Sequence, residues 1–145
     1  MVKTANMIQC TAATVLLRRP NGDFLMQLRD DGRGKLIPYP NMWNFPGGAV
    51  EPSEDPLNAV IREIEEEFEI KLQPGDCKEL WRYTHDHAAI DHVFLCKVPA
   101  NTTPILHEGA AWAWMTLDQI EKLKLGFDQG KIVAYIARTR PTEEG

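Results

Sequence analysis

The spacing of hydrophobic and polar residues in the first third of the chain predicts strands and one long loop. Thr11–Leu17 and Phe24–Leu28 are rich in β-branched and aliphatic residues. The turn sequence Pro20-Asn21-Gly22-Asp23 separates them, so we expect a β-hairpin. Trp43–Phe45 predicts a further short strand. Arg29–Asn41 holds two glycines and two prolines among its charges, which is typical of a surface loop, and loops of this length are often functional.

Apolar residues at helical spacing predict a long helix from about Glu54 to Phe68. The turn sequence Glu51-Pro52-Ser53 precedes it, and Ser53 is the expected N-cap. The spacing i, i+4, i+7 and i+11 places one apolar stripe on the helix, formed by Leu57, Ile61, Ile64 and Phe68. This stripe must pack against a sheet or another helix.

The rest of the chain predicts further strands and two shorter helices. The expected strands are Glu79–Thr84 and Val93–Val98, around a polar bend at His85–Asp91, and Ala110–Thr116; the expected helices are Leu117–Leu123 and Gly130–Arg138. Trp112 and Trp114 should share one face of their strand. The order of elements predicts an α/β (α+β) fold, a mixed β-sheet with α-helices packed on it. We expect a single domain over residues 1–145, with residues 1–8 and 140–145 frayed.

The chain is acidic, with a formal net charge of −5 over 145 residues. Binding of bulk nucleic acid needs clustered Lys and Arg, so this charge argues against it. An acidic protein that handles phosphates also needs a local cation. No stretch approaches the roughly 20 apolar residues of a membrane span, and Met1–Cys10 lacks the apolar run of a signal peptide. We therefore expect a cytoplasmic protein with no membrane partner.

The cysteines and histidines favour ordinary structural roles. Cys10, Cys77 and Cys96 are odd in number and have no C-x-x-C spacing, so they suggest neither a disulfide framework nor a zinc site, and we expect reduced, buried thiols. His85 and His87 could share a strand face and so raise a zinc hypothesis. Without a cysteine or carboxylate partner at a fitting spacing, we favour strand and turn histidines.

Three glutamates form a stripe on the predicted long helix. At about 100° per residue, Glu63, Glu66 and Glu67 lie together, beside the apolar stripe, and Arg62 is within i, i+4 reach of Glu66. Each exposed i, i+4 carboxylate pair repels by about 0.2–0.5 kcal/mol, which a divalent cation with oxygen ligands would offset. The alternative is a solvated acidic helix face. Gly47-Gly48, just before the helix, supplies a backbone that can approach a ligand closely.

The glycine pair and the helix together resemble the Nudix box, G-x5-E-x7-R-E-U-x-E-E-x-G-U, where U is a bulky aliphatic residue. The chain matches eight of the nine specified positions, with Gly48, Glu54, Arg62, Glu63, Ile64, Glu66, Glu67 and Ile70. The departure is Glu69, where the family has a glycine; a left-handed glutamate costs on the order of 1 kcal/mol, or the helix ends differently. The resemblance extends from about Thr11 to Ile136 and implies a Nudix-type fold, with the mixed sheet sandwiched between helices.

The resemblance also implies a metal centre. Glu63, Glu66 and Glu67 would bind Mg²⁺, for which Mn²⁺ can substitute, directly or through water, and the carbonyl of Gly47 would be a further ligand. Arg62 would orient the cluster by pairing with a glutamate. Glu54 would be a supporting carboxylate.

Two further residues are candidates by the same resemblance. Arg29, at the end of the second strand, matches a place where MutT-like pyrophosphohydrolases carry a phosphate-binding arginine; the alternative is an exposed strand-end charge. Glu108 lies in a region where relatives often place a metal-binding or base carboxylate; the alternative is an ordinary loop charge.

The resemblance implies a Mg²⁺-dependent hydrolase that cuts a diphosphate linkage in a nucleoside diphosphate derivative, such as a nucleoside triphosphate, a modified nucleotide or a nucleotide sugar. The alternative is a Nudix module that binds a nucleotide without turnover. The small-molecule substrate, the phosphorus attacked and the general base among Glu63, Glu66 and Glu108 stay open. Monomer and homodimer are both open, although dimers are common among relatives.

Overall fold

The computed structural model describes residues 10–140. The predicted frayed ends at residues 1–8 and 141–145 lie outside the described residues, and Arg140 forms the C-cap of the last helix. The strands are β1 (Thr11–Arg18), β2 (Phe24–Leu28), β3 (Trp43–Asn44), β4 (Gly47–Ala49), β5 (Cys77–His85), β6 (Ala88–Lys97) and β7 (Ala111–Met115). The helices are α2 (Pro56–Phe68), α3 (Leu117–Glu121) and α4 (Gly130–Thr139), with a 3₁₀ turn, η1, at Pro74–Asp76.

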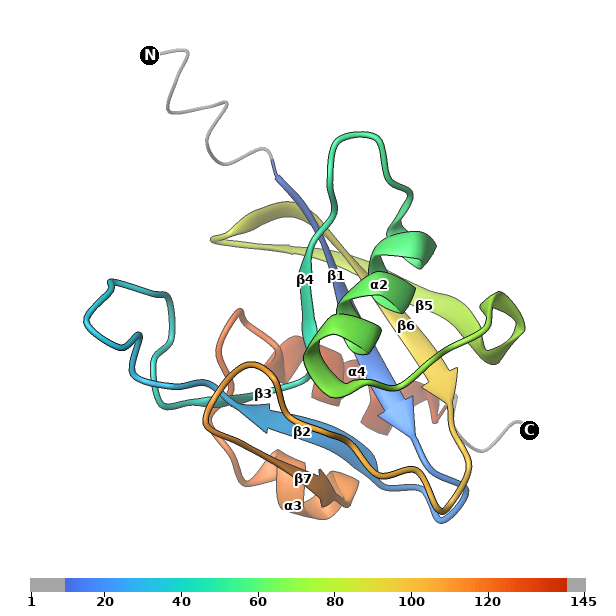
Figure 1. The fold of residues 1–145 in the computed structure, drawn as a ribbon. Coiled ribbons are helices and arrows are strands. Elements are labelled where there is room, and N and C mark those ends of the chain that lie inside the picture. Colours follow the sequence, from blue (N-terminus) through green and yellow to red (C-terminus); the bar gives the residue numbers. More distant parts are fainter. Residues whose placement is uncertain (1–9, 141–145) are drawn as a thin grey trace.

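The strands form one mixed sheet, as the sequence predicts. Its order is β3-β2-β1-β6-β5, with β4 paired to β1 and β7 paired to β2. β1 and β6 run parallel, whereas the other pairs are antiparallel, including the predicted β1–β2 hairpin. Figure 1 shows α2 on one side of the sheet and α3 with α4 on the other, so the sheet is sandwiched between helices.

Two hydrophobic clusters fill the two sides of the sheet. Alternation along β1 divides its residues, because Val15 and Leu17 face one cluster and Leu16 faces the other. The first cluster contains Ile64 and Phe68 of α2, with the predicted stripe residues Leu57 and Ile61 and both Trp112 and Trp114 packed against it. The second contains Ile120, Ile132, Val133 and Ile136 of α3 and α4. The predicted shared face of Trp112 and Trp114 is thereby confirmed.

The start of α2 differs from the prediction. Asp55, not Ser53, is the N-cap, and its Oδ1 accepts a hydrogen bond from the backbone N–H of Asn58 at 2.8 Å. The helix therefore begins at Pro56, since proline at the first position needs no hydrogen-bond partner for its nitrogen. Glu54 is left outside the helix, where its side chain is free to reach towards Arg62.

The end of α2 resolves the question that Glu69 raised. Glu69 takes the left-handed conformation, with φ of 55°, and its N–H donates to Glu65 O at 3.0 Å. Its carboxylate pairs with the imidazole of His107. The following loop is fastened to the helix end by backbone bonds from Ile105 N to Phe68 O and from His107 N to Glu67 O, both 2.9 Å.

The strands also correct the sequence prediction. β5 and β6 extend to His85 and from Ala88, so the bend is Asp86-His87 alone, because His85 and Asp91 are held in the hairpin by a hydrogen bond. Gly47 and Gly48, with Ala49, form β4, a strand that the sequence did not predict and that pairs with β1. Within residues 10–140, no helix is both long enough and apolar enough to cross a membrane.

Candidate active site

Arg62 joins the acidic residues around α2 into one hydrogen-bonded network. Its Nε and Nη2 donate to the two carboxylate oxygens of Glu54 at 2.7 and 2.9 Å. Its Nη1 donates to Glu63 at 2.9 Å and to Glu66 at 3.4 Å. The guanidinium hydrogen bonds hold the pKa of Glu54 down at about 2, while the pKa of Arg62 is raised, first by the hydrogen bond to Glu54. Arg62 thus fixes three carboxylates relative to one another.

A glycine on β4 makes room for the Glu63 carboxylate. A Cβ at Gly48 would stand 2.7 Å from Glu63 Cδ and 2.8 Å from each carboxylate oxygen, closer than such atoms approach. β4 and α2 can therefore pack with the carboxylate between them only because Gly48 has no side chain. The side chain of Glu63 is 17% exposed, compared with 61% for Glu66.

Glu67 is buried, although the sequence placed the acidic stripe beside the buried face. The residue is 5% exposed, and its Oε1 has no hydrogen-bond partner. The pKa of Glu67 is raised to about 10, first by burial and then by a hydrogen bond and charge from Glu63 and by the charges of Glu108 and Glu66. Burial and nearby negative charges both destabilise an ionised carboxylate, so packing does not explain why Glu67 lies here. A cation bound beside Glu67 would offset both effects.

Gly47 presents its backbone carbonyl away from β1. Val15 N donates to Pro46 O and Val50 N donates to Thr11 O, both at 2.8 Å. Because hydrogen-bonded and non-hydrogen-bonded pairs alternate along an antiparallel ladder, the Thr14–Gly47 pair is of the non-hydrogen-bonded kind. The Gly47 carbonyl therefore points out of the ladder, and Gly47 lines the same pocket as Glu67.

These oxygen atoms fit a hard divalent cation. Mg²⁺ takes one or two carboxylates and completes an octahedron with water and substrate oxygens, so it needs an open set of ligands rather than a closed cage. Across residues 10–140, no group of three or more His, Cys, Asp or Glu side chains is placed to hold a metal ion by itself, so water and substrate oxygens would have to complete the ligand set. The Oε1 atom of Glu67 is buried and has no hydrogen-bond partner, which supports a bound cation, because a metal bond would satisfy this oxygen.

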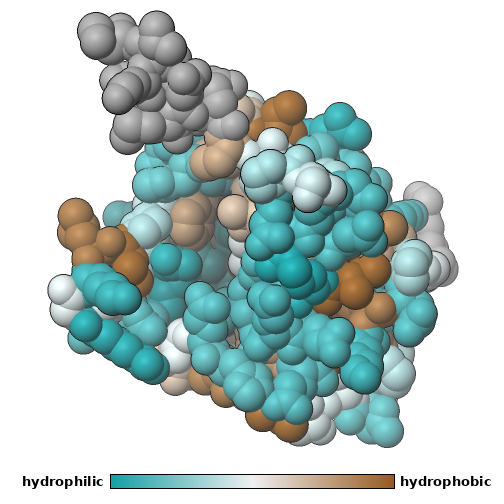
Figure 2. Space-filling view, turned by 45° about the horizontal axis from the view of Figure 1, so that its top comes forward, coloured by the Kyte–Doolittle hydropathy of each residue, from teal (hydrophilic) through white to brown (hydrophobic). Residues whose placement is uncertain are grey.

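A pocket of about 420 Å³ opens beside these carboxylates. Its lining includes Glu67, Glu108 and Gly47 together with the basic side chains of Arg29, Arg33 and Lys35 and other residues of the 29–41 loop. Figure 2 shows a hydrophilic surface over α2 with a hollow beside it. The structure thus brings Glu108 and Arg29 to the acidic cluster, where the sequence could only suggest them. We call this cavity the charged pocket.

Arg29 lines the charged pocket and also a second pocket. Its Nε donates to Pro38 O at 2.9 Å, and its guanidinium carbon lies 5.1 Å from the ring centroid of Phe127. Among residues 10–140, no carboxylate forms a salt bridge with Arg29. Its remaining N–H groups are therefore available for an anion.

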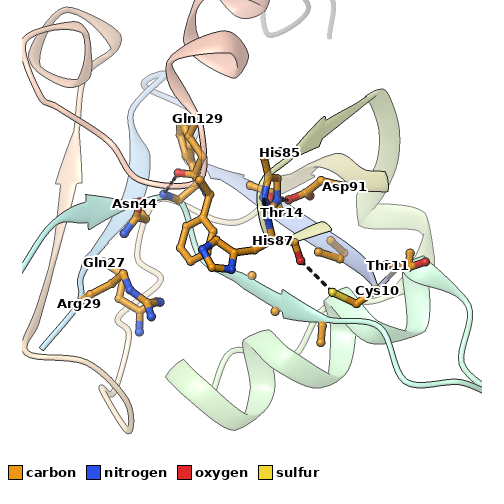
Figure 3. Close-up of a pocket in the computed structure, with 17 residues that line it drawn as sticks. Cys10, Thr11, Thr14, Gln27, Arg29, Asn44, His85, His87, Asp91 and Gln129 are labelled. Carbon is orange, nitrogen blue, oxygen red and sulfur yellow. Dashed lines mark hydrogen bonds and ion pairs between the residues drawn. The ribbon is translucent and has the colours of Figure 1, made fainter. Parts of the chain in front are cut away.

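The second pocket, of about 240 Å³, is rimmed by aromatic rings; we call it the aromatic pocket. Tyr39 and Phe127 pack edge to face with their centroids 4.7 Å apart, and His87 lies 5.7 Å from each of them. Figure 3 shows side chains from β1, β2, β3 and the β5–β6 hairpin pointing into this space. Gln27, Arg29 and Gly47 line both pockets, so the two form one continuous site.

A buried polar network forms one wall of the aromatic pocket. Thr14 Oγ1 donates to Asp91 Oδ1 at 2.8 Å, and His85 Nε2 lies 2.8 Å from Asp91 Oδ2. The backbone N–H of His87 donates to His85 Nδ1 at 3.1 Å, so the ring proton belongs on Nε2 and is donated to Asp91. His85 is therefore satisfied within the fold. Cys10, expected to be buried, is exposed at this pocket, where its Sγ donates to His87 O.

Comparison with known proteins decides the family. A sequence model of the NUDIX domain matches residues 9–136. The chain belongs to this family. The resemblance carried by the box residues is thereby confirmed. Solved structures agree on the fold of this NUDIX domain: the crystal structure of a MutT protein from Methanosarcina mazei Go1 matches with a TM-score of 0.73 at 21% identity, over 92% of this chain and 96% of that one.

Curated relatives cover the NUDIX domain only in part. A MutT-like protein of Streptomyces ambofaciens is 29% identical over 97 residues, which are 66% of this chain and 62% of the relative. Diphosphoinositol polyphosphate phosphohydrolase 3-alpha of Mus musculus is 35% identical over 60 residues, 41% of this chain and 37% of the relative. The chain thus spans less than two thirds of the length of either relative.

The sequence located the acidic half of the site in this NUDIX domain and missed the aromatic half. Tyr39 and Asp91 were not candidates, because they stand in a separate turn and strand with no motif around them, and Phe127 was ambiguous between a core residue and one that stacks on a base. One signal was available: Tyr39 and Phe127 lie in segments rich in glycine and proline, as binding loops often do.

Proposed function

We propose that this protein is a Mg²⁺-dependent hydrolase that cuts a diphosphate linkage in a nucleotide-like substrate. The observation that carries the proposal is Glu67, a buried carboxylate with a partnerless oxygen, next to Glu63 and beside the outward carbonyl of Gly47. Membership of the NUDIX family supports the same reading. Burying the Glu67 carboxylate without a partner for its Oε1 lowers the free energy of unfolding, so packing alone does not account for it.

The surroundings of each residue indicate its role in the proposed reaction. Glu63, Glu66, Glu67 and the Gly47 carbonyl would hold the cation, which when bound neutralises phosphate charge and lowers the pKa of a coordinated water. Arg62 orients Glu63 and Glu66 through its Nη1. Glu66 and Glu108 are the exposed carboxylates, so their Oε atoms are the ones open to take a proton from a water molecule.

The two joined pockets favour a substrate with an aromatic group at one end and phosphates at the other. His87 and Phe127 line the aromatic pocket and offer ring edges and faces to a flat heterocycle, as aromatic side chains do for nucleobases, while Tyr39 packs against both rings. Arg29 lines both pockets, whereas Arg33 and Lys35 line only the charged pocket. The mouse relative is named for diphosphoinositol polyphosphates, but such a ligand has no aromatic group to fill the first pocket, so a nucleotide fits this site better.

A substrate panel tests the proposal. Nucleoside triphosphates, modified nucleotides, nucleotide sugars, dinucleoside polyphosphates and a diphosphoinositol polyphosphate are incubated with Mg²⁺, and the products are identified. We expect hydrolysis of at least one nucleotide, lost in excess EDTA and restored by Mg²⁺ or Mn²⁺. Binding without product from any member would indicate a binding module instead.

Arg29→Ala gives the matching test of the substrate site. The variant should raise KM or lower kcat while Mg²⁺ affinity stays unchanged, because the guanidinium contacts phosphate and not the cation. Arg82→Ala is the control, since Arg82 is exposed, pairs with Glu79 and lines neither of these two pockets. Kinetics equal to the parent in both variants would remove Arg29 from the site.

A further inference from the structure

Cys77 and Cys96 face each other across two neighbouring strands. Cys77 is the first residue of β5, and the antiparallel register places it directly opposite Cys96 of β6. Both side chains lie on the same side of the sheet: Cys96 is a buried member of the first hydrophobic cluster, and Cys77 packs against that cluster. The two thiols are 19 positions apart in sequence, so only the fold brings them together.

The pair is of the kind that brings cross-strand side chains closest. The backbone N–H of Cys77 donates to Pro74 O at the end of η1 and is thus turned away from β6. In such non-hydrogen-bonded pairs the Cα atoms are about 4.5 Å apart, within the range of about 4.4–6.8 Å that disulfides span. The register therefore places the two Cα atoms at a separation that a disulfide can span.

The two thiols differ in reactivity. The Cys96 thiol donates a hydrogen bond to Cys77, which lowers the pKa of Cys77 although burial opposes it. The same hydrogen bond, with burial, raises the pKa of Cys96. Cys77 is half-buried and reachable from solvent, whereas Cys96 is enclosed. Thiolates are the reactive form, so Cys77 is the sulfur that meets an oxidant first.

We propose that Cys77 and Cys96 form a reversible disulfide, a modification site separate from the hydrolytic centre. With hydrogen peroxide as the oxidant, the Cys77 sulfur attacks one peroxide oxygen, the O–O bond breaks, and water leaves to give a sulfenic acid. The Cys96 sulfur then attacks the Cys77 sulfur, its proton and the sulfenic hydroxyl leave as a second water, and the S–S bond forms. Two electrons pass from the thiols to the peroxide.

Cys10 cannot replace Cys77 or Cys96 in this disulfide, because it lies too far away. Its carbonyl accepts a hydrogen bond from Ala89 N, near the start of β6. Cys96 lies seven residues farther along that strand, about 23 Å away at the rise of an extended chain. The position of Cys10 therefore gives the proposal an internal control, because an exposed thiol on the same chain should stay unlinked.

The test oxidises the folded full-length chain with a small excess of hydrogen peroxide and follows the intact mass and the peptide map. The parent and Cys10→Ser should each lose two hydrogen atoms, yield a Cys77–Cys96 peptide and return to the starting mass with dithiothreitol. Cys77→Ser should form no linkage, and Cys96→Ala should accumulate a sulfenic acid at Cys77 that a dimedone probe captures. Parent chain that gains only oxygen, or that links Cys10, would overturn the proposal.

Stability supplies a second readout, measured on Cys10→Ser so that only the pair can react. The oxidised form should melt at a higher temperature than the reduced form, because a bond between strands already in register restricts the unfolded chain without distorting the folded one. An oxidised form that melts at a lower temperature would mean that the strands do not hold the sulfurs in bonding position, contrary to the proposal.

Discussion

The pH dependence of folding tests the environment of Glu67 without any knowledge of the substrate. Burial, together with the neighbouring carboxylates, raises the pKa of Glu67 from 4.5 to about 10, so the metal-free folded protein keeps a proton there that the unfolded chain releases. Stability from this group is therefore fully present below about pH 4.5 and is lost as the pH rises towards about 10. One proton corresponds to about 1.4 kcal/mol per pH unit, so the free energy of unfolding should fall by up to about 4 kcal/mol between pH 5 and pH 8.

Glu67→Gln removes this titration with almost no change of shape. The variant should match the parent near pH 5 and exceed it increasingly above that pH, in urea unfolding with EDTA at each pH. The two proteins differ only at residue 67, so the difference between their profiles reports the Glu67 carboxyl and its coupling to the neighbouring carboxylates. Glu65→Gln is the matched control, because Glu65 is an exposed glutamate of the same helix and should show no such divergence.

Mg²⁺ should reverse the order of the two proteins. A cation that binds the folded cluster stabilises the parent by RT ln(1 + [L]/Kd), about 2.7 kcal/mol at a hundredfold excess over Kd. Glu67→Gln should lose most of that gain, at matched ionic strength. Parallel pH profiles for parent and variant would refute the burial argument, and equal Mg²⁺ shifts in both would refute the assignment of Glu67 as a ligand.

Two glycine positions and one glutamate provide further tests. Gly48→Ala should weaken Mg²⁺ binding and turnover but lower the free energy of unfolding by under about 1 kcal/mol, because the new Cβ meets only the movable end of Glu63. Gly47→Ala should unfold the protein, because its Cβ would stand 2.2 Å from Ala13 O. Mg²⁺ titration and melting curves distinguish the two, and parental Mg²⁺ affinity in Gly48→Ala would contradict the packing argument. Glu69→Gly should raise the free energy of unfolding by about 0.5–1 kcal/mol, since it relieves a left-handed conformation and gives up only an exposed pair with His107. A loss of stability in urea unfolding would show that the His107 pair outweighs the strain.

The acidic half of the site could be predicted because it lies within one short segment. Gly48, Arg62 and Glu63 are close in sequence, and helical geometry alone fixes how the last two stand relative to Glu66. The strands β1 and β2 and the helix α4 were likewise predictable from local patterns. The helix start was missed by two residues because both Ser53 and Asp55 can cap a helix, and only the path of the chain decides between them.

The aromatic half depends on contacts that no local pattern contains. Tyr39 and Phe127 are 88 positions apart in sequence and take positive φ angles of 51° and 54°, a conformation that gives no signal in residues other than glycine. Tyr39 is tied to the hairpin through its hydroxyl, which donates to Asp86. The pocket exists only when three loops have already been placed by the sheet.

The burial of Glu67 depends on the glycine pair of β4 as well as on the glutamates of α2. On a helical wheel with about 100° per residue and Glu63 set at 0°, the predicted apolar stripe of α2 covers about 100–160°, and Glu67 lies near 40°. In the structure Ala59 and Val60, at about 320° and 60°, are also buried, so the buried arc reaches across the position of Glu67. α2 can turn this side to the sheet because β4, which packs against it, is Gly47-Gly48-Ala49, and a bulkier strand would occupy the space of the carboxylates. The glycine pair is thus required for the acidic cluster as much as the glutamates are: it brings charged residues against a sheet, out of water, where a divalent cation gives the largest electrostatic benefit.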